Sequence, residues 1–410
     1  MADVSAALDG ARERIEEHRK GEMTVQVTDA RGCPLSGREV VLHQEDSAFL
    51  FGANIFHLDP DDRSDRQRLY QERFCALLNY ATLPFYWRHY EPEAGRTREA
   101  RLRAMAQWCA EHGIRTKGHP LVWHQVHPAW ADQQGTPALT LLEARVGHIV
   151  RTFAGLVDIW DVINESTVSE RFDNAIGDWA RREGATRIAA ESLKWARAAS
   201  QRATLLVNDF NVSPAYEAQI EGLLSGPHRP GAIGIQSHMH DGEWPLERAW
   251  QVCQTYGRFG LPLHFTELTV LSGDRIPPNV PWSTYRQEHW PSTPEGEEKQ
   301  ADYLEQFYTL LFSHPAVAAI TCWDFADGGW MNAPGGLVST DMGPKPVYER
   351  LLRLTRGDWR TNARLTTDRD GRAHARAFYG SYLVTDSRTG RSVTCEHAGP
   401  GPVRAVLALD

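Results

Sequence analysis

Two glutamates close apolar runs in this chain of 410 residues. Glu165 ends the run VDIWDVINE (157–165), and Glu267 ends LPLHFTE (261–267). A pair of carboxyl groups can cleave a glycosidic bond when one is held protonated to donate to the leaving oxygen and the other stays ionised to attack or to activate water. Each glutamate taken alone is also consistent with a salt-bridged acid at a strand end.

Other polar and aromatic side chains follow the neighbouring apolar runs, where they could bind a sugar. Trp323 and Trp330 fit a core position equally well. His119, His124 and His127 could form a metal cluster, but strand alternation would place His119 and His124 on opposite faces, so we expect no metal and no cofactor. The candidate binding residues are His119, Trp123, Asn164, Asn208, Gln236, His238, Trp323 and Trp330.

Residues 46–356 alternate short apolar runs with longer amphipathic stretches, which predicts a (β/α)₈ barrel. The chemistry of such a barrel lies at the C-terminal ends of its strands. Glu165 and Glu267 end the fourth and seventh runs, so they should face each other across the barrel mouth. The Pro-rich segment 277–294 is a candidate functional loop. The predicted strands are 49–55, 80–86, 114–123, 157–165, 203–209, 232–239, 261–267 and 317–325.

Both ends of the chain have a two-residue period, which is typical of strands. We therefore expect one small β-domain, assembled from residues 1–45 (a polar helix over 3–19, then strands) and 357–410, around a catalytic barrel at 46–356. Two unrelated β extensions are the alternative. Because Phe378, Tyr379 and Tyr382 alternate as core residues would, we expect a structural brace rather than a sugar-binding module.

Composition excludes several other classes of protein. The net charge of −9 is opposite to what phosphate binding needs, which argues against a nucleic-acid partner. No apolar window reaches the roughly 18 residues of a membrane span. The six Cys show no disulfide spacing, and the charged N-terminus does not resemble a signal peptide, so we expect a cytoplasmic protein unless a leader was removed.

Six motifs occur in the order found in glycoside hydrolase family 10, the retaining β-xylanase family, which residues 49–355 resemble. They are GHPLVWH (118–124), WDVINE (160–165), LVNDFN (206–211), GIQSHMH (234–240), FTE (265–267) and the Trp323–Trp330 segment. The resemblance implies a (β/α)₈ barrel and a double displacement with Glu165 as acid/base and Glu267 as nucleophile. It also implies that Asn164, His119 and Trp123 surround the attacked sugar, that Gln236 and His238 lie beside the nucleophile, that Trp323 forms an aromatic floor, and that Trp330 belongs to a lid.

Three departures from the family pattern bear on the substrate. The family's Glu-Asn-x-x-Lys-Trp run, which hydrogen-bonds sugars, is here Thr-Leu-Pro-Phe-Tyr-Trp (82–87), so Tyr86 belongs to an aromatic wall. Val126 stands where the family has Gln, and Thr269 replaces the Asp that holds the histidine matched by His238. Arg88, beside the wall, could hold an anionic group.

We therefore favour a retaining β-glycosidase that acts on a small glycoside, either short or carrying an apolar aglycone, because a site without these polar partners should no longer select a xylan chain. An endo-β-1,4-xylanase is the first alternative. A biosynthetic transglycosylase, or an acid/base enzyme acting on a sugar-containing metabolite, is the second. A protein that only binds carbohydrate has no need for both acids.

Overall fold

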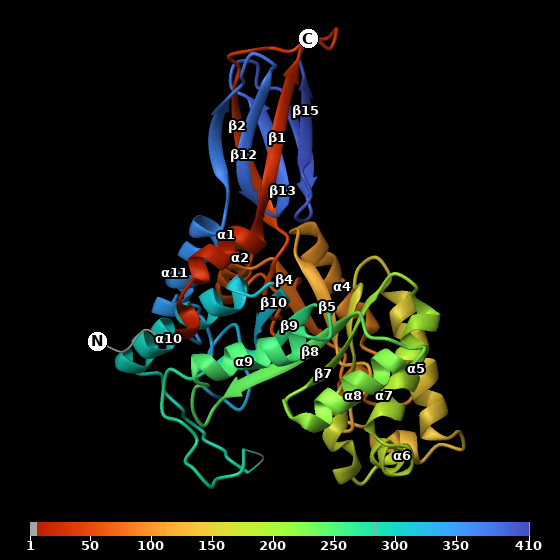
Figure 1. Ribbon diagram of the computed structural model, residues 1–410. Helices are drawn as coiled ribbons and strands as arrows, with labels where there is room; N and C mark the ends of the chain where they lie inside the picture. The colour runs from red at the N-terminus through yellow and green to blue at the C-terminus, as the bar shows by residue number, and fades with distance from the viewer. Residues whose placement is uncertain (1–5, 283, 410) are drawn as a thin grey trace.

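Eight parallel strands close into a barrel at the centre of the computed structural model, which describes residues 6–282 and 284–409 (Figure 1). Their order around the ring is β10-β3-β4-β5-β6-β7-β8-β9. Each predicted apolar run overlaps one of these strands, so the (β/α)₈ prediction is confirmed, although β9 continues to Val270, beyond the predicted end at Glu267. The strands are β3 (Leu50–Asn54), β4 (Tyr80–Pro84), β5 (Arg115–His119), β6 (Ile159–Asn164), β7 (Thr204–Asp209), β8 (Ala232–Met239), β9 (Leu263–Val270) and β10 (Val317–Cys322).

Helices cover the outside of the barrel and turn their apolar faces inward. Side-chain caps begin some of them: Ser64 accepts a hydrogen bond from the Gln67 amide at α2, and Thr293 does so from the Gly296 amide at α10. None of the helices in the described part of the chain is both long and apolar enough to cross a membrane. They are α2 (Asp65–Leu77), α3 (Trp87–Tyr90), α4 (Glu99–Glu111), α5 (Ala138–Thr152), α6 (Ala175–Glu183), α7 (Ala185–Ala199), α8 (Pro214–Ser225), α9 (Leu246–Gly257), α10 (Pro294–Ser313) and α11 (Pro346–Arg353).

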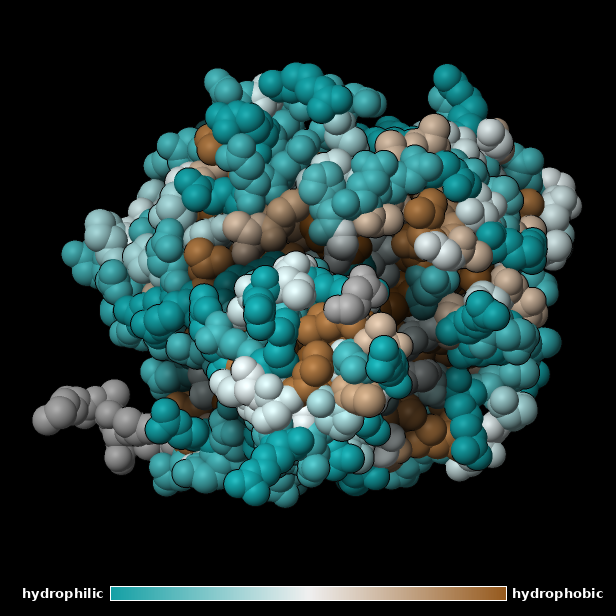
Figure 2. All heavy atoms as spheres, turned by 90° about the horizontal axis from the view of Figure 1, so that it is seen from above, coloured by the Kyte–Doolittle hydropathy of each residue, from teal (hydrophilic) through white to brown (hydrophobic). Residues whose placement is uncertain are grey.

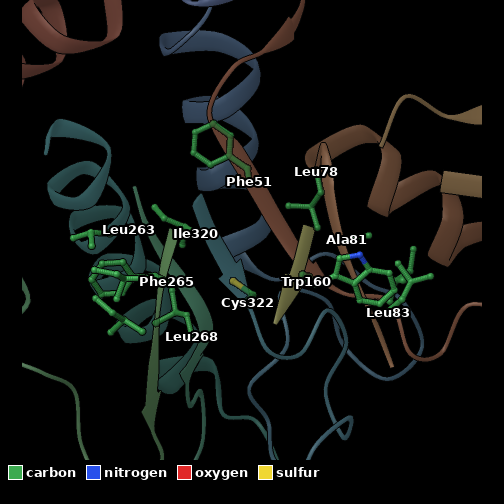
Figure 3. Close-up of a cluster of buried hydrophobic side chains, with 14 of the residues drawn as sticks. Phe51, Leu78, Ala81, Leu83, Trp160, Leu263, Phe265, Leu268, Ile320 and Cys322 are labelled. Atoms are coloured by element: carbon green, nitrogen blue, oxygen red, sulfur yellow. The ribbon is translucent and has the colours of Figure 1, made fainter. Parts of the chain in front are cut away.

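Strand side chains pack in the core both inside the ring and against these helices (Figure 3). On one side Phe265 meets Phe307 of α10 edge to face, with ring centroids 5.9 Å apart. On the other, Trp160 packs against Phe85 at 4.9 Å. The Trp160 indole fits only because residue 118 is glycine, since a Cβ there would lie 2.1 Å from the ring.

Strands from the two ends of the chain form the β-domain, which confirms the prediction of one domain from both termini (Figure 1). One sheet has the order β12-β1-β15 and the other β11-β2-β13-β14. Their apolar faces, including Val25, Leu42 and Tyr382, share one buried cluster. Of the predicted N-terminal helix, α1 covers Ala11–Arg19, and residues 3–5 lie outside the described part. The strands are β1 (Lys20–Thr28), β2 (Glu39–Ser47), β11 (Asn362–Thr366), β12 (Arg372–Phe378), β13 (Gly380–Asp386), β14 (Ser392–His397) and β15 (Val403–Ala408).

The β-domain packs on the end of the barrel where the strands begin, opposite the end that carries the glutamates (Figure 1). Aromatic rings make this junction: Phe312 of α10 stacks on Trp359 with centroids 4.2 Å apart and meets Phe49 at 5.0 Å. Arg19 lies over the Phe49 ring at 4.8 Å. Seen from above, the surface at this end is mostly hydrophilic, with apolar patches between polar groups (Figure 2).

Phe312→Ala should destabilise the protein by about 3–5 kcal/mol, because it removes a buried ring that the barrel and the β-domain share. The measurement is denaturant unfolding followed by circular dichroism. Val406→Ala is the control: this side chain is 50% exposed, so its free energy of unfolding should change by less than about 0.5 kcal/mol. Equal stability of the two variants would show that the aromatic junction does not stabilise the fold.

Candidate active site

The two glutamates are buried toward the C-terminal ends of their strands. Glu165 directly follows β6 and is 8% exposed, and Glu267 lies within β9 and is 4% exposed. The strand predicted over 157–165 ends one residue early, because Glu165 adopts a left-handed conformation with φ 54°. That conformation is unfavourable for a residue with a Cβ. Its amide donates to the Asn208 carbonyl at 2.8 Å, which fixes the turn that aims the carboxyl into the barrel mouth.

A chain of side-chain amides links the two carboxyl groups. The Asn208 amide nitrogen donates to Glu267 Oε1 at 2.7 Å and to Asn164 Oδ1 at 2.8 Å. The Gln236 amide nitrogen donates to the same Asn164 oxygen at 3.1 Å and to Glu165 Oε1 at 3.2 Å. The two acids are therefore held by one network contributed by four neighbouring strands.

The environment of Glu165 favours its protonated form. Burial raises the pKa of this carboxyl to about 8, and the charge of Glu267 adds to the effect. Hydrogen bonds from Gln236 and from Trp123 Nε1, which lies 3.0 Å from Glu165 Oε2, oppose the shift only in part. Glu165 is thus a proton donor at neutral pH.

Positive charge opposes the protonation of Glu267. Burial raises the pKa of its carboxyl, while His119 and Lys117 act to lower it. Lys117 is fully buried, and its Nζ lies 2.6 Å from Asp161 Oδ2, the oxygen that also bonds His119 Nδ1 at 2.8 Å. His119 Nε2 then lies 3.9 Å from Glu267 Oε1. Burial has the largest effect, so the pKa of Glu267 is raised overall, and the positive charge of the buried Lys117 limits this rise.

Thr269, which replaces the family's aspartate, still contacts the ring of His238. His238 Nε2 lies 3.1 Å from Glu267 Oε2, and His238 Nδ1 lies 2.9 Å from Thr269 Oγ1. Burial lowers the pKa of His238 to about 3, so the ring is neutral. A hydroxyl partner orients this ring without adding a second negative charge next to Glu267.

Two adjoining cavities open at this end of the barrel. The catalytic cavity, about 570 Å³, contains both glutamates, and the distal cavity, about 490 Å³, lies between Tyr86 and the segments around Asn54 and Arg101. The residues that line both are Tyr86, Trp123, Gln125, Trp323 and Trp330.

Ten of the twelve candidate residues line the catalytic cavity. Asn208 bonds Glu267 but is not part of the lining, and Arg88 lines neither cavity, with an exposed side chain. The structure therefore does not place Arg88 where it was expected to meet a ligand. The ten are Tyr86, His119, Trp123, Asn164, Glu165, Gln236, His238, Glu267, Trp323 and Trp330.

The prediction that His119 and His124 point to opposite faces is wrong. Strand β5 ends at His119, so alternation does not reach His124, and His124 Nε2 lies 3.8 Å from Glu165 Oε2. Within residues 6–282 and 284–409, no cluster of three or more His, Cys, Asp or Glu could hold a metal ion.

Sequence reasoning missed several residues of the two cavities. Trp282 belongs to the Pro-rich loop that was singled out, and Phe210 directly follows the β7 motif, so both had a signal. Gln125 lines both cavities. It directly precedes Val126, which stands where the family has Gln. The others resemble ordinary surface or core residues in the sequence: Asn54, Phe56, His57, His89, Arg98 and Arg101 in the distal cavity, and Asp241, Trp244 and Arg248 in the catalytic one.

A parallel eight-stranded barrel with two linked, buried carboxyl groups at its C-terminal end defines a class of barrel proteins built for acid/base and nucleophilic chemistry. Residues 24–354 match the model of glycosyl hydrolase family 10, and the chain belongs to this family.

Individual relatives are distant. The anti-sigma-I factor RsgI6 of Acetivibrio thermocellus is 26% identical over 94% of this chain and 47% of its own length. Endo-1,4-beta-xylanase 1 of Arabidopsis thaliana is 24% identical over 93% of this chain and 38% of its own. The chain thus spans less than half of either protein. The endo-1,4-beta-xylanase of Geobacillus stearothermophilus is 26% identical over 65% of this chain and 85% of its own length.

Solved structures show the same fold. Xylanase 10B from Thermotoga petrophila, in complex with xylobiose, superposes with a TM-score of 0.62 at 22% identity, covering 76% of this chain and 95% of that one. The shared part is the barrel architecture.

The raised pKa of Glu165 predicts the alkaline limb of the pH profile. A general acid works while protonated, so kcat/KM on an aryl β-glycoside should fall about tenfold per pH unit above about pH 8. Glu165→Ala, assayed with an activated leaving group that needs no proton, should lose this limb. The measurement is kcat/KM at pH values between about 5 and 10, in steps of about one pH unit. An alkaline limb below pH 6 in the unmodified protein would refute the assignment.

Thr269 should act by orienting His238. Thr269→Val removes the hydroxyl with little change in volume and should lower kcat/KM about tenfold, the effect of one lost buried hydrogen bond. Thr269→Ser keeps the hydroxyl and is the control. Thr269→Asp should raise the pKa of His238, because a carboxylate favours the imidazolium form. Histidine NMR titration measures this, and an unchanged His238 titration in Thr269→Asp would contradict the role.

Proposed function

We propose that this protein is a retaining β-glycosidase that acts on a short or aglycone-bearing β-glycoside rather than on a xylan chain. The observation that carries the proposal is a complete carboxyl pair, with its amide network, set against an aromatic wall where the family has polar sugar-binding residues.

The charges of the site suit a double displacement. Protonated Glu165 donates its proton to the leaving oxygen while ionised Glu267 attacks the anomeric carbon, which gives a glycosyl-enzyme. The ester no longer carries the negative charge of Glu267, which is one of the two main causes of the raised pKa of Glu165. Glu165 then loses its proton more readily and acts as the base that activates water.

The wall formed by residues 82–86 supports a changed substrate. Thr82 and Leu83, which occupy the positions of the family's Glu and Asn, are fully buried and line neither cavity. Tyr86, in the position of the Lys, packs its ring against His119 at 5.4 Å and Trp123 at 5.5 Å. The three polar partners of a sugar are absent, so a site of this kind should select weakly for a xylan chain.

Two apolar side chains that line the catalytic cavity support an apolar aglycone. Phe210 lines it and is 46% exposed, which is rare for a large apolar side chain in this protein. Trp282 lines the same cavity and packs against His240 at 4.9 Å. Flat apolar surfaces of this kind bind a planar group at low entropic cost.

An endo-β-1,4-xylanase is the second candidate. Two observations favour it: the relatives from A. thaliana and G. stearothermophilus carry that name, and Gln125 supplies an amide to both cavities. A transglycosylase, or an acid/base enzyme acting on a sugar-containing metabolite, uses the same two glutamates without releasing free sugar.

A panel of aryl β-glycosides (xyloside, xylobioside, glucoside, galactoside, arabinoside and glucuronide) together with soluble xylan tests these candidates by sugar release. We expect release from at least one small glycoside and none from xylan. Release from xylan or the xylobioside would show that the wall tolerates a xylan chain. Silence across the panel would refute hydrolysis of simple glycosides.

Two variants serve as controls for the chemistry. Glu267→Ala should lower the rate by several orders of magnitude on every substrate, because it removes the nucleophile. Glu165→Ala should do so only on substrates with poor leaving groups, because activated ones leave without a proton. Full activity of both variants would show that cleavage takes place elsewhere.

A further inference from the structure

The distal cavity is a second binding region, separate from the carboxyl pair. Tyr86, Trp123 and Trp323 line both cavities, so a ligand that reaches the glutamates can extend past these rings into the distal one. The wall next to it, residues 82–86, matches the family run that hydrogen-bonds sugars. A sugar of the substrate, or a substituent on it, is the natural occupant.

Two arginines give this cavity its charge. Arg98 precedes α4 and Arg101 lies in its first turn, and both line the cavity with exposed side chains. Neither guanidinium has a hydrogen-bonding or ion-pair partner anywhere in residues 6–282 and 284–409. Arg103, on the same helix, differs because it bonds Glu99 and the Thr152 carbonyl.

No ionised acid lines the cavity opposite these arginines. Asp324 is the one carboxyl among the lining residues, and burial raises its pKa to about 8, so it is neutral at pH 7. The whole chain carries a net charge of −9, so the two arginines of this cavity do not reflect a generally basic chain.

Two histidines of the cavity wall respond to the same positive charge. The pKa of His57 is lowered by desolvation and by repulsion from Arg66 and Arg101. The pKa of His89 is lowered by desolvation and by repulsion from Arg88 and Arg98. Both rings stay neutral at pH 7 and can donate or accept hydrogen bonds beside the arginines.

We propose that the distal cavity binds an anionic substituent of the substrate, a carboxylate, sulfate or phosphate on a sugar, through Arg98 and Arg101. A guanidinium offers paired N–H donors that match the oxygens of such groups. An unpaired arginine next to neutral hydrogen-bonding rings supplies both charge and orientation. The inference rests on the proposed function and names the class of substrate that the site selects.

Calorimetric titration with three disaccharides of matched shape tests it. The probes are cellobiose, its analogue with a glucuronic acid at the non-reducing end, and cellobiose 6′-phosphate. Glu267→Gln is the parent protein, so that no cleavage disturbs the binding measurement. We expect at least one anionic probe to bind about tenfold tighter than cellobiose at low salt, the value of one or two charge-assisted hydrogen bonds. The preference should shrink at high salt, since these side chains are exposed.

The double variant Arg98→Gln/Arg101→Gln, made in the same parent, should reduce the preference to about twofold or less. Arg96→Gln is the matched control. Arg96 lies two residues before Arg98, is paired with Glu93 and lines neither cavity, so this variant should keep the preference.

Preference for the carboxylate probe would indicate a uronic acid substrate, and preference for the phosphate probe a sugar phosphate. Equal binding of all three probes, absence of binding by any of them, or a preference that survives in the double variant would overturn the inference. The glycoside panel is read separately. Cleavage of neutral glycosides without an anionic preference refutes only this inference, whereas an anionic preference without cleavage refutes only the proposed function.

Discussion

The burial of two carboxyl groups at one end of the barrel is the constraint on which the site depends. A buried carboxylate without partners is strongly disfavoured. Here one carboxyl avoids the cost by staying protonated. For the other, His119 and the buried Lys117 limit the rise of the pKa that burial causes, and His238 Nε2 lies 3.1 Å from its Oε2. Asp161 in turn pairs with Lys117 at 2.6 Å, so the positive charge is itself held in place. The difference between the two environments is consistent with the separate roles of acid and nucleophile that we propose for them.

Aromatic side chains next to the buried carboxyl groups also line the space that the substrate would occupy. Trp123 donates a hydrogen bond to Glu165, and its ring packs beside Tyr86, which lines both cavities. Rings that exclude water therefore replace the polar groups that would otherwise bind a sugar chain. In our proposal, polar recognition moves outward to the arginines that line the distal cavity. This proposal places catalytic chemistry and substrate choice on separate segments, as is common where loops on a barrel carry specificity.

The opposite end of the barrel packs against the β-domain. The two sheets of the β-domain share one apolar cluster and meet the barrel through Phe312, Trp359 and Phe49. This aromatic junction covers the end where the strands begin, so it stabilises the fold without touching the cavities.

The sequence by itself determined the barrel and predicted the two glutamates as its acids. Hydrophobic periodicity is a local signal, and each run of apolar residues encodes one strand wherever it lies in the ring. Residues that end such strands, including Glu165, Asn164 and Glu267, are therefore brought together by the fold class alone. The two-residue period at both ends of the chain likewise predicted the β-domain.

Only the tertiary structure decided contacts between segments that are distant in the chain. The sequence showed that Thr269 stands in place of the family's Asp, but only the structure shows that its hydroxyl contacts His238, because β8 and β9 are neighbours in register. Arg88 was expected beside the ligand because it follows the wall in sequence, but the short helix α3 turns it to solvent. In the sequence, Arg98 and Arg101 resemble ordinary exposed residues at the start of a helix. Only the structure shows that the start of α4 borders a cavity and that both arginines line it. The physical reason is the same in each case: periodicity specifies which face of an element is buried, whereas the direction of a polar side chain depends on what packs next to it.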